Sequence, residues 1–256
     1  MTNTHQKQVL GQFDPVASAY LTSEVHARGE DLASAARWAG AFPTARVLDL
    51  GCGAGHLSFA VAPHVHSLIA YDLSPGMLTL VAQTAAERGL RNIAVEKGAV
   101  ESLPFDDAAF DLVCSRFSAH HWSDLPAALK EARRVLKPGG QLMMIDVAAP
   151  ENPLIDTHLQ AIELLRDPSH VRDYSPSEWR TALIAADLHP LETHAWPLRL
   201  GFDAWVTRMR TPQQNVDMIR VLLARAPQEV KAGLKLEGDC SFKVDVIGLC
   251  AVAGGR

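Results

Sequence analysis

From residue 45 onward, short apolar runs alternate with amphipathic segments, and this alternation limits the fold more than any other feature of the chain. The apolar runs lie at 46–50, 68–72, 93–96, 110–114 and 142–147. Each intervening segment is long enough to form a crossover between parallel strands. Such a pattern is typical of β-α-β units that build a parallel sheet with helices on both faces. The sequence therefore predicts an α/β fold.

Two helices of this core can be placed from the spacing of their apolar residues. The first follows the first strand and carries Leu57, Val61 and Val65 at helical spacing. The second has apolar residues at 125, 129, 132 and 136 and is expected to end at Pro138-Gly139-Gly140. Proline cannot continue a helix, and glycine tolerates the positive φ that often follows one.

The remaining segments do not follow this alternation. Residues 1–35 are expected to be helical and to form an N-terminal cap over the sheet. Segments 149–176 and 202–239 contain several prolines and further helical patterns, so we expect them to be cap insertions. Segments 177–201 and 240–256 are expected to supply a helix and two strands. The whole chain of 256 residues is thus predicted to be one domain with a seven-stranded, mostly parallel sheet.

Composition and charge exclude several other classes of protein. Hydrophobic residues make up 48% of the chain and charged residues 21%, which argues against disorder. The net charge of −5 provides no field that would attract nucleic acid or anionic lipid. No apolar stretch approaches the ~20 residues of a membrane span, and no signal peptide is visible, so a cytoplasmic location is expected. The four cysteines lack the spacing of a zinc site, and we expect free thiols and no metal.

A glycine-rich segment, Asp49-Leu50-Gly51-Cys52-Gly53-Ala54-Gly55, follows the first strand and opens a helix. This is the setting of a nucleotide-binding loop, because glycines let the backbone approach a ligand closely. Asp72 ends the second strand, 21 residues after Gly51. At this spacing a carboxylate accepts hydrogen bonds from ribose hydroxyls in a doubly wound sheet. Loop and carboxylate together predict an adenosine-containing ligand.

Two residues distinguish a dinucleotide from another adenosine ligand. A dinucleotide loop requires glycine at the position of His56, whose side chain would obstruct packing of the helix on the strand. The Asp49 carboxylate would repel a pyrophosphate and attract an ammonium group. A nicotinamide-dependent oxidoreductase is therefore the less favoured alternative.

Five motifs in order carry a family resemblance. They are Val47–Gly55, Asp72, Leu103-Pro104-Phe105, Phe110–Val113 and Arg134–Gly140. With these motifs the chain resembles the class I S-adenosylmethionine-dependent methyltransferases, most of all the branch of ubiquinone and menaquinone biosynthesis methyltransferases. The resemblance implies a Rossmann-like fold, S-adenosylmethionine as cofactor and a cofactor-binding core over 45–148.

The same resemblance implies which residues bind the cofactor. The methionine part would lie against the glycine loop, formed by Asp49, Gly51, Cys52 and Gly53. The remaining contacts would be Asp72 for the ribose, Leu73 and Met77 for one face of the adenine, Ala99 and Val100 for its other face, Arg116 and Phe117 beside the sulfonium, and Tyr20, His26 and Arg28 for the carboxylate. An acidic residue often stands at the Ala99 position in this family, so adenine recognition here is expected to use backbone groups.

Three residues are candidates for catalysis: His120, His121 and Asp146. They follow the fourth and fifth strands, whose carboxyl ends are where ligands bind in open α/β sheets, and His can accept a proton near neutral pH. The acceptor is expected to be a small, largely apolar or aromatic molecule, because the cap segments are rich in Leu, Met and Trp. A non-catalytic protein that holds S-adenosylmethionine or S-adenosylhomocysteine is the other alternative. The acceptor, the methylated atom and the oligomeric state are left open by the sequence.

Overall fold

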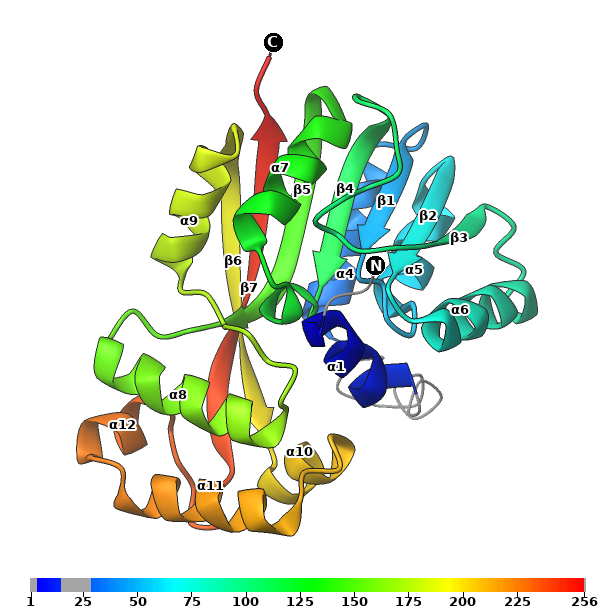
Figure 1. Cartoon of the computed structure of the whole chain (residues 1–256). Coiled ribbons are helices and arrows are strands. Elements are labelled where there is room, and N and C mark those ends of the chain that lie inside the picture. The colour runs from blue at the N-terminus through cyan, green and yellow to red at the C-terminus, as the bar shows by residue number, and fades with distance from the viewer. Residues whose placement is uncertain (1–3, 15–28, 256) are drawn as a thin grey trace.

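A computed structural model describes residues 4–14 and 29–255 and contains one seven-stranded sheet in the order β3-β2-β1-β4-β5-β7-β6 (Figure 1). The strands are β1 (Arg46–Leu50), β2 (Ser67–Asp72), β3 (Ile93–Lys97), β4 (Phe110–Arg116), β5 (Leu136–Ala148), β6 (Leu188–Leu200) and β7 (Phe242–Ala253). Strands β1 to β5 pair in parallel, and β7 runs antiparallel between β5 and β6. The predicted Rossmann-like α/β fold with a mostly parallel sheet is confirmed.

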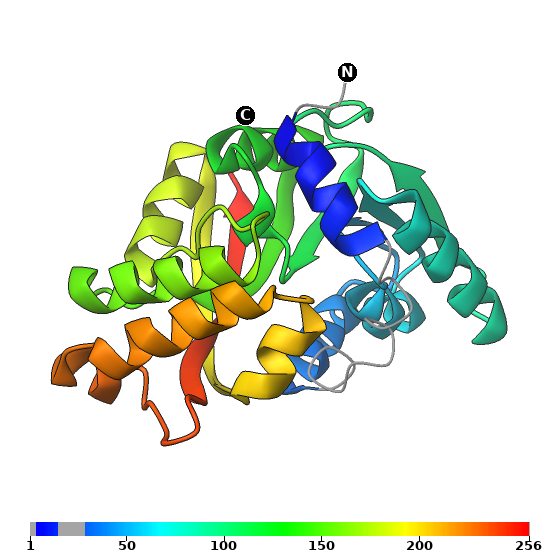
Figure 2. The ribbon, with the colours of Figure 1, turned by 60° about the horizontal axis from the view of Figure 1, so that its bottom comes forward.

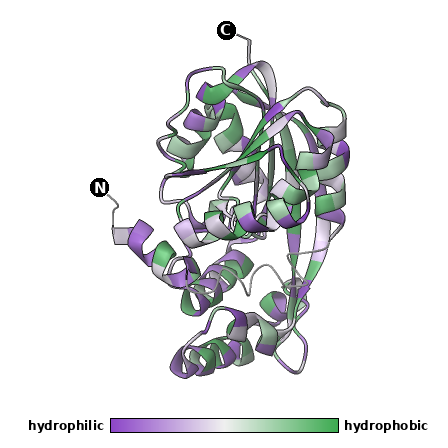
Figure 3. Cartoon of the chain, turned by 90° about the vertical axis from the view of Figure 1, so that its right-hand side faces the viewer, coloured by the Kyte–Doolittle hydropathy of each residue, from purple (hydrophilic) through white to green (hydrophobic). Residues whose placement is uncertain are grey.

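Helices cover both faces of this sheet. They are α1 (Thr4–Phe13), α4 (Glu30–Gly40), α5 (His56–Val61), α6 (Pro75–Glu87), α7 (Leu125–Val135), α8 (Pro153–Arg166), α9 (Pro176–Ala185), α10 (Phe202–Arg208), α11 (Gln213–Arg225) and α12 (Gln228–Gly233), with short 3-10 turns η2 (Ala62–His64) and η3 (Ala119–His121). One apolar core joins α7 and α9 to the sheet, and a second joins α4, α5 and α6 to its other face. In Figure 3 the helices carry apolar and polar residues side by side, as helices with one buried face do.

Two details of the predicted helices are wrong: the helical position of Val65 and the helix end at Pro138. Helix α5 ends at Val61, and Val65 is extended after the turn η2. Helix α7 ends at Val135, before Pro138, because Leu136 already pairs with Phe110 in the sheet. Strand pairing thus ends α7 earlier than the local apolar spacing indicates, whereas α5 passes into the 3-10 turn η2.

The segments 149–176 and 202–239 form a lobe at the end of the sheet toward which β1, β4 and β5 run. Helices α8, α10, α11 and α12 share a third apolar core with the adjoining ends of β6 and β7 (Figure 1). The N-terminal segment is divided between two places. Helix α4 packs on a face of the sheet, whereas α1 crosses its carboxyl edge beside this lobe (Figure 2).

Two further properties concern the described residues as a whole. Among them, no helix is long and apolar enough to cross a membrane. All four cysteines are free thiols, and all but Cys240 are buried.

Candidate functional site

The first of two adjoining pockets lies at the carboxyl ends of β1, β2 and β4. The strand order reverses between β1 and β4, which is where ligands bind in open α/β sheets. The pocket brings together every predicted cofactor residue that lies in the described part of the chain: Asp49, Gly51, Cys52, Gly53, Asp72, Leu73, Met77, Ala99, Val100, Arg116 and Phe117. Tyr20, His26 and Arg28 lie outside the described residues.

The loop after β1 adopts a conformation that requires glycine. Gly51 has φ of 64°, and a Cβ atom there would lie 1.8 Å from the Ser118 hydroxyl oxygen. The backbone N–H groups of Gly51 and Cys52 both donate to the carbonyl of Tyr71, at 2.8 and 3.1 Å. The loop is therefore hydrogen-bonded to β2 on one side and packs closely against the β4–α7 connection on the other.

Asp49 provides a buried negative group on the floor of this pocket. Its Oδ2 accepts a hydrogen bond from Ser58 at 2.5 Å, whereas its buried Oδ1 has no partner among the described residues. Burial raises the pKa of Asp49 to about 7. A buried carboxylate with an unused acceptor is costly unless a ligand supplies a donor or a positive charge. An ammonium group meets both needs.

Asp72 connects the glycine loop to the end of β2. Its two carboxylate oxygens accept hydrogen bonds from the backbone N–H groups of Gly53 and Ser74, each at 2.8 Å. Each oxygen can accept one more bond, as a pair of ribose hydroxyls requires. Burial raises the pKa of Asp72 above its ordinary value.

The part of the pocket expected to hold adenine is mostly apolar. Leu73, Met77 and Val100 line it, and the Tyr71 hydroxyl holds the Ala99 carbonyl at 3.2 Å. Glu101 also lines the pocket, but its carboxylate accepts bonds from the backbone and hydroxyl of Ser123. The structure thus places an acidic side chain two positions after Ala99, where the sequence analysis did not expect one.

Helix α1 belongs to the segment expected to form the N-terminal cap, and it supplies pocket residues that the sequence analysis did not single out. His5, Gln6, Val9 and Phe13 all line the pocket, and the His5 Nε2 atom lies 2.8 Å from the His121 carbonyl oxygen. His5, Val9 and Phe13 are four residues apart, a spacing that places them on one face of a helix. This spacing in the sequence could have indicated that the three residues face the pocket together.

Arg116 carries its charge in a buried ion pair. It bonds to Asp31 at the start of α4, and its guanidinium lies 4.4 Å from the centre of the Phe117 ring. Both partners are less than 10% exposed. Because Asp31 balances the charge of Arg116, the guanidinium does not oppose a cationic ligand in the first pocket as a lone charge would.

A second pocket adjoins the first and lies under the lobe of α8 and α10. Phe13, Phe117 and His121 line both pockets and form the boundary between them. The other residues of the second pocket are His120, Val147, Glu163, Arg166, Asp167, Asp173, Leu198, Leu200, Trp205, Arg208 and Met209. The second pocket combines apolar side chains with several acidic and basic ones, among them Glu163, Arg166 and Asp173.

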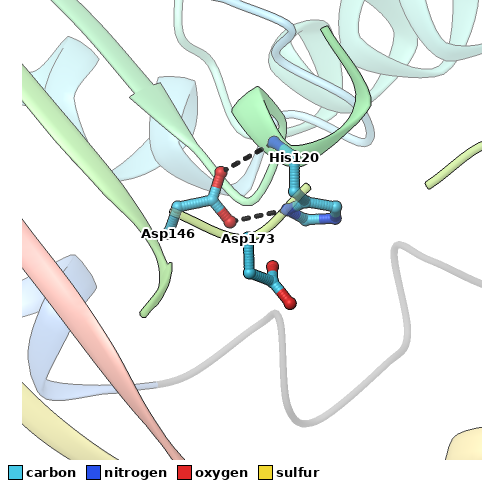
Figure 4. Close-up of side chains that lie close together, drawn as sticks. All are labelled: His120, Asp146 and Asp173. Atoms are coloured by element: carbon cyan, nitrogen blue, oxygen red, sulfur yellow. Dashed lines mark hydrogen bonds and ion pairs between the residues drawn. The ribbon is translucent and has the colours of Figure 1, made fainter. Parts of the chain in front are cut away.

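His120 and Asp146 form a closely held pair at the edge of the second pocket (Figure 4). The His120 Nδ1 atom lies 2.6 Å from Asp146 Oδ1. Asp146 also accepts bonds from the backbone N–H groups of Ala119, His120 and Val147. Asp146 therefore orients the ring of His120 and leaves its Nε2 atom directed away from this bond.

The two adjacent histidines differ in charge. Burial lowers the pKa of His120, but the charge and hydrogen bond of Asp146, with the charges of Asp173 and Glu163, outweigh it and raise the pKa to about 9. His120 is therefore an imidazolium at neutral pH. Burial and the charge of His120 lower the pKa of His121 to about 4, so His121 is neutral. The Nδ1 atom of His121 donates to the Ser169 carbonyl at 3.0 Å.

A glycine turn after β1, a buried acid before it and a second acid at the end of β2 define the nucleotide-type site of class I methyltransferases. The model of the methyltransferase domain family matches residues 48–144. The uncharacterized methyltransferase YcgJ of Bacillus subtilis is 37% identical over 219 residues, covering 86% of this chain and 87% of that protein. Its crystal structure superposes with a TM-score of 0.85 over 89% of this chain and 99% of that one. The chain belongs to the class I S-adenosylmethionine-dependent methyltransferase family.

Two other relatives show the range of this family. The uncharacterized protein YafE of Escherichia coli is 47% identical over 197 residues, which cover 77% of this chain and 95% of that protein. The 2-phytyl-1,4-naphtoquinone methyltransferase of Synechococcus elongatus is 33% identical over 159 residues, covering 57% of this chain and 66% of that enzyme. The similarity to quinone methyltransferases is thus confined to a part of each chain.

Proposed function

We propose that this chain transfers the methyl group of S-adenosylmethionine to a small, largely apolar or aromatic molecule. The Oδ1 atom of buried Asp49, which has no hydrogen-bond partner in the described part of the chain, carries the proposal, because it fits the ammonium group of that donor. Asp72 would hold the ribose, and Leu73, Met77, Ala99 and Val100 the adenine. Bound there, the donor supplies an activated methyl group, and the adjoining second pocket supplies a place for the acceptor.

The chain's own contribution to the reaction is alignment and exclusion of water. Well-oriented reactants can gain ~7 to 11 kcal/mol from positioning alone. We infer that α1 and the lobe of α8 and α10–α12 act as the cap that closes over both pockets. The apolar boundary of Phe13 and Phe117 supports this assignment.

His120, with Asp146 holding its ring, is placed to act on the acceptor. Because His120 already carries a proton at neutral pH, it is suited there to donate a hydrogen bond, and to accept a proton only above about pH 9. This differs from the sequence-based expectation of a proton-accepting His120. His121 shares the boundary between the pockets and would position both ligands.

The test combines calorimetry and mass spectrometry. S-adenosylmethionine and S-adenosylhomocysteine are expected to bind, and NAD is expected not to bind. A screen of small phenols, naphthols, quinols and amines should reveal an acceptor that gains the mass of one CH₂ group. Binding without product for any acceptor would favour a non-catalytic binding protein, and tight binding of NAD would favour an oxidoreductase.

A further inference from the structure

A second carboxylate, which the sequence analysis did not single out, lies beside the ring of His120. Asp173 follows α8 and lines the second pocket. A ring nitrogen of His120, an oxygen of Asp146 and an oxygen of Asp173 all lie within 4.8 Å of one another (Figure 4). Asp173 is only 2% exposed, and its buried Oδ2 has no hydrogen-bond partner among the described residues.

The backbone around Asp173 holds the residue in place while its carboxylate stays unused. Its N–H donates to the side-chain oxygen of Gln160, and its carbonyl accepts from the nitrogen of the same amide, at 3.1 and 2.9 Å. A buried carboxylate without a donor is rare, because leaving such a group unpaired costs free energy. The structure therefore indicates that a ligand supplies the hydrogen-bond donor for the Asp173 carboxylate.

The chemistry of the three side chains favours a hydroxyl group over a metal ion. Asp146 already accepts four hydrogen bonds, three from backbone N–H groups and one from His120. Of the three side chains, His120 and Asp173 keep atoms that have no hydrogen-bond partner among the described residues. Two protein ligands are fewer than a closed metal site uses. A ring nitrogen of His120 and an oxygen of Asp173 lie within 4.8 Å of each other. An oxygen atom that accepts from one and donates to the other at ~2.8 Å each can bridge a gap of ~4.6 Å.

We propose that the acceptor is a hydroxyl compound whose oxygen binds between His120 and Asp173, and that the Asp173 carboxylate takes its proton during O-methylation. His120 donates a hydrogen bond to the same oxygen. As the O–H bond breaks, its electrons stay on oxygen, which forms the bond to the methyl carbon, and the electrons of the broken C–S bond remain on the sulfur of the donor. The proton leaves Asp173 for solvent when the product departs. This inference rests on the proposed function for its reaction but not for its binding site.

The charges around Asp173 match this role. The groups that face it are Glu163 and Arg166 on α8, His120 on η3 and Asp146 on β5, with Arg208 on α10 across the same pocket. Burial and the charge of Glu163 raise the pKa of Asp173 well above its ordinary value, while His120 opposes that rise. A base is most effective when its pKa lies near the working pH, and a raised carboxyl pKa moves toward that range.

The binding part can be tested without knowing the natural acceptor. Protein saturated with S-adenosylhomocysteine is titrated with 4-nitrophenol between pH 5.5 and 6.5, and with 4-nitroanisole, which lacks the hydroxyl. Wild type and the control Asp203→Asn, an exposed carboxylate on α10, are expected to bind the phenol at least 10-fold more tightly than the ether. Asp173→Ala, which removes the acceptor oxygen, should lose that preference. Failure of the wild type to prefer the phenol, or an unchanged preference in Asp173→Ala, overturns the proposal.

The catalytic part uses a hydroxyl acceptor found in the screen. Asp173→Asn is expected to lower kcat by ~10² to 10⁴ and to remove the acidic limb of the pH–rate profile. Its Kd for S-adenosylhomocysteine should stay within a few-fold of wild type, which also shows that the variant is folded. Turnover like wild type, or acceptors that are methylated only on nitrogen or carbon, would contradict the assignment. If no compound is methylated, the proposed function fails, and the phenol titration still decides the site.

Discussion

Asp49→Asn is the substitution that separates charge from shape in the first pocket. Asparagine has nearly the same size and can still accept the bond from Ser58, so the loop should keep its conformation. The variant loses the ability to become negatively charged at this position, where Oδ1 has no hydrogen-bond partner within residues 4–14 and 29–255. The effect on ligand affinity therefore measures the electrostatic contribution of this one buried group.

The expected magnitude follows from the pKa of Asp49, which burial raises to about 7. With that pKa, roughly 3% of the carboxyl groups are ionised at pH 5.5 and roughly 75% at pH 7.5, by proton linkage. A ligand ammonium group binds the ionised form, so the affinity of the wild type for S-adenosylhomocysteine should rise roughly 25-fold over this interval. In Asp49→Asn this rise should be lost, and any remainder reports other groups such as Asp72.

Isothermal titration calorimetry at several pH values, in buffers of different ionisation enthalpy, measures the affinity and the proton release. Wild type should release close to one proton per ligand below pH 6.5, and Asp49→Asn should release far fewer. Equal pH profiles in the two proteins would refute the reasoning, because the ligand would then not respond to the charge of Asp49.

The same group has an opposite effect on the protein without ligand. The folded-state pKa of Asp49 lies above the ordinary 3.8, so the folded protein binds the additional proton between about pH 4 and pH 7. The free energy of unfolding contributed by this group is therefore lost as the pH rises through that interval, by up to ~4 kcal/mol for three pKa units. Thermal unfolding at pH 8 should show Asp49→Asn to be more stable than wild type.

Four further predictions concern other parts of the site. Asp72→Ala should weaken binding of S-adenosylmethionine and S-adenosylhomocysteine ~10- to 150-fold, the equivalent of ~1.5 to 3 kcal/mol for hydrogen bonds to a charged group; unchanged calorimetric affinity would contradict this. Gly51→Ala should abolish binding, because its Cβ would lie 1.8 Å from the Ser118 hydroxyl at a positive φ; a binding isotherm like wild type would disprove that conflict. For His120, whose folded-state pKa is raised to about 9, stabilisation is complete below pH 6.5 and is lost as the pH rises toward 9, so denaturant unfolding of His120→Gln should lack this pH dependence. Hydrogen exchange should show protection of α1 and of the lobe of α8 and α10–α12 when ligand binds; protection limited to the glycine loop would count against a closing cap.

Much of the core was accessible from the sequence because its determinants are local. A strand that is buried on both faces is a short apolar run, and a turn with positive φ selects glycine, so β1, the loop at Gly51 and the acid at Asp72 could be located by pattern and spacing. The seven strands and their mostly parallel pairing are confirmed for the same reason. The helical position predicted for Val65 and the helix end predicted at Pro138 are wrong. Helix α5 gives way to the 3-10 turn η2, and strand pairing of Leu136, which local spacing does not describe, ends α7 earlier.

The second pocket was decided by tertiary structure. The residues of this pocket come from elements that are far apart in the sequence: α1, the η3 turn, the segment after α8, and α10. Only the fold brings together Phe13, His120, Asp173 and Arg208 around one pocket. The charge of His120 likewise depends on its contact with Asp146, 26 residues away. A histidine in a sequence has a pKa near 6.5, and only its buried neighbours determine whether it donates or accepts a proton. The sequence by itself therefore determined the family and the ligand-binding loop, while packing between distant elements decided which side chains meet the acceptor.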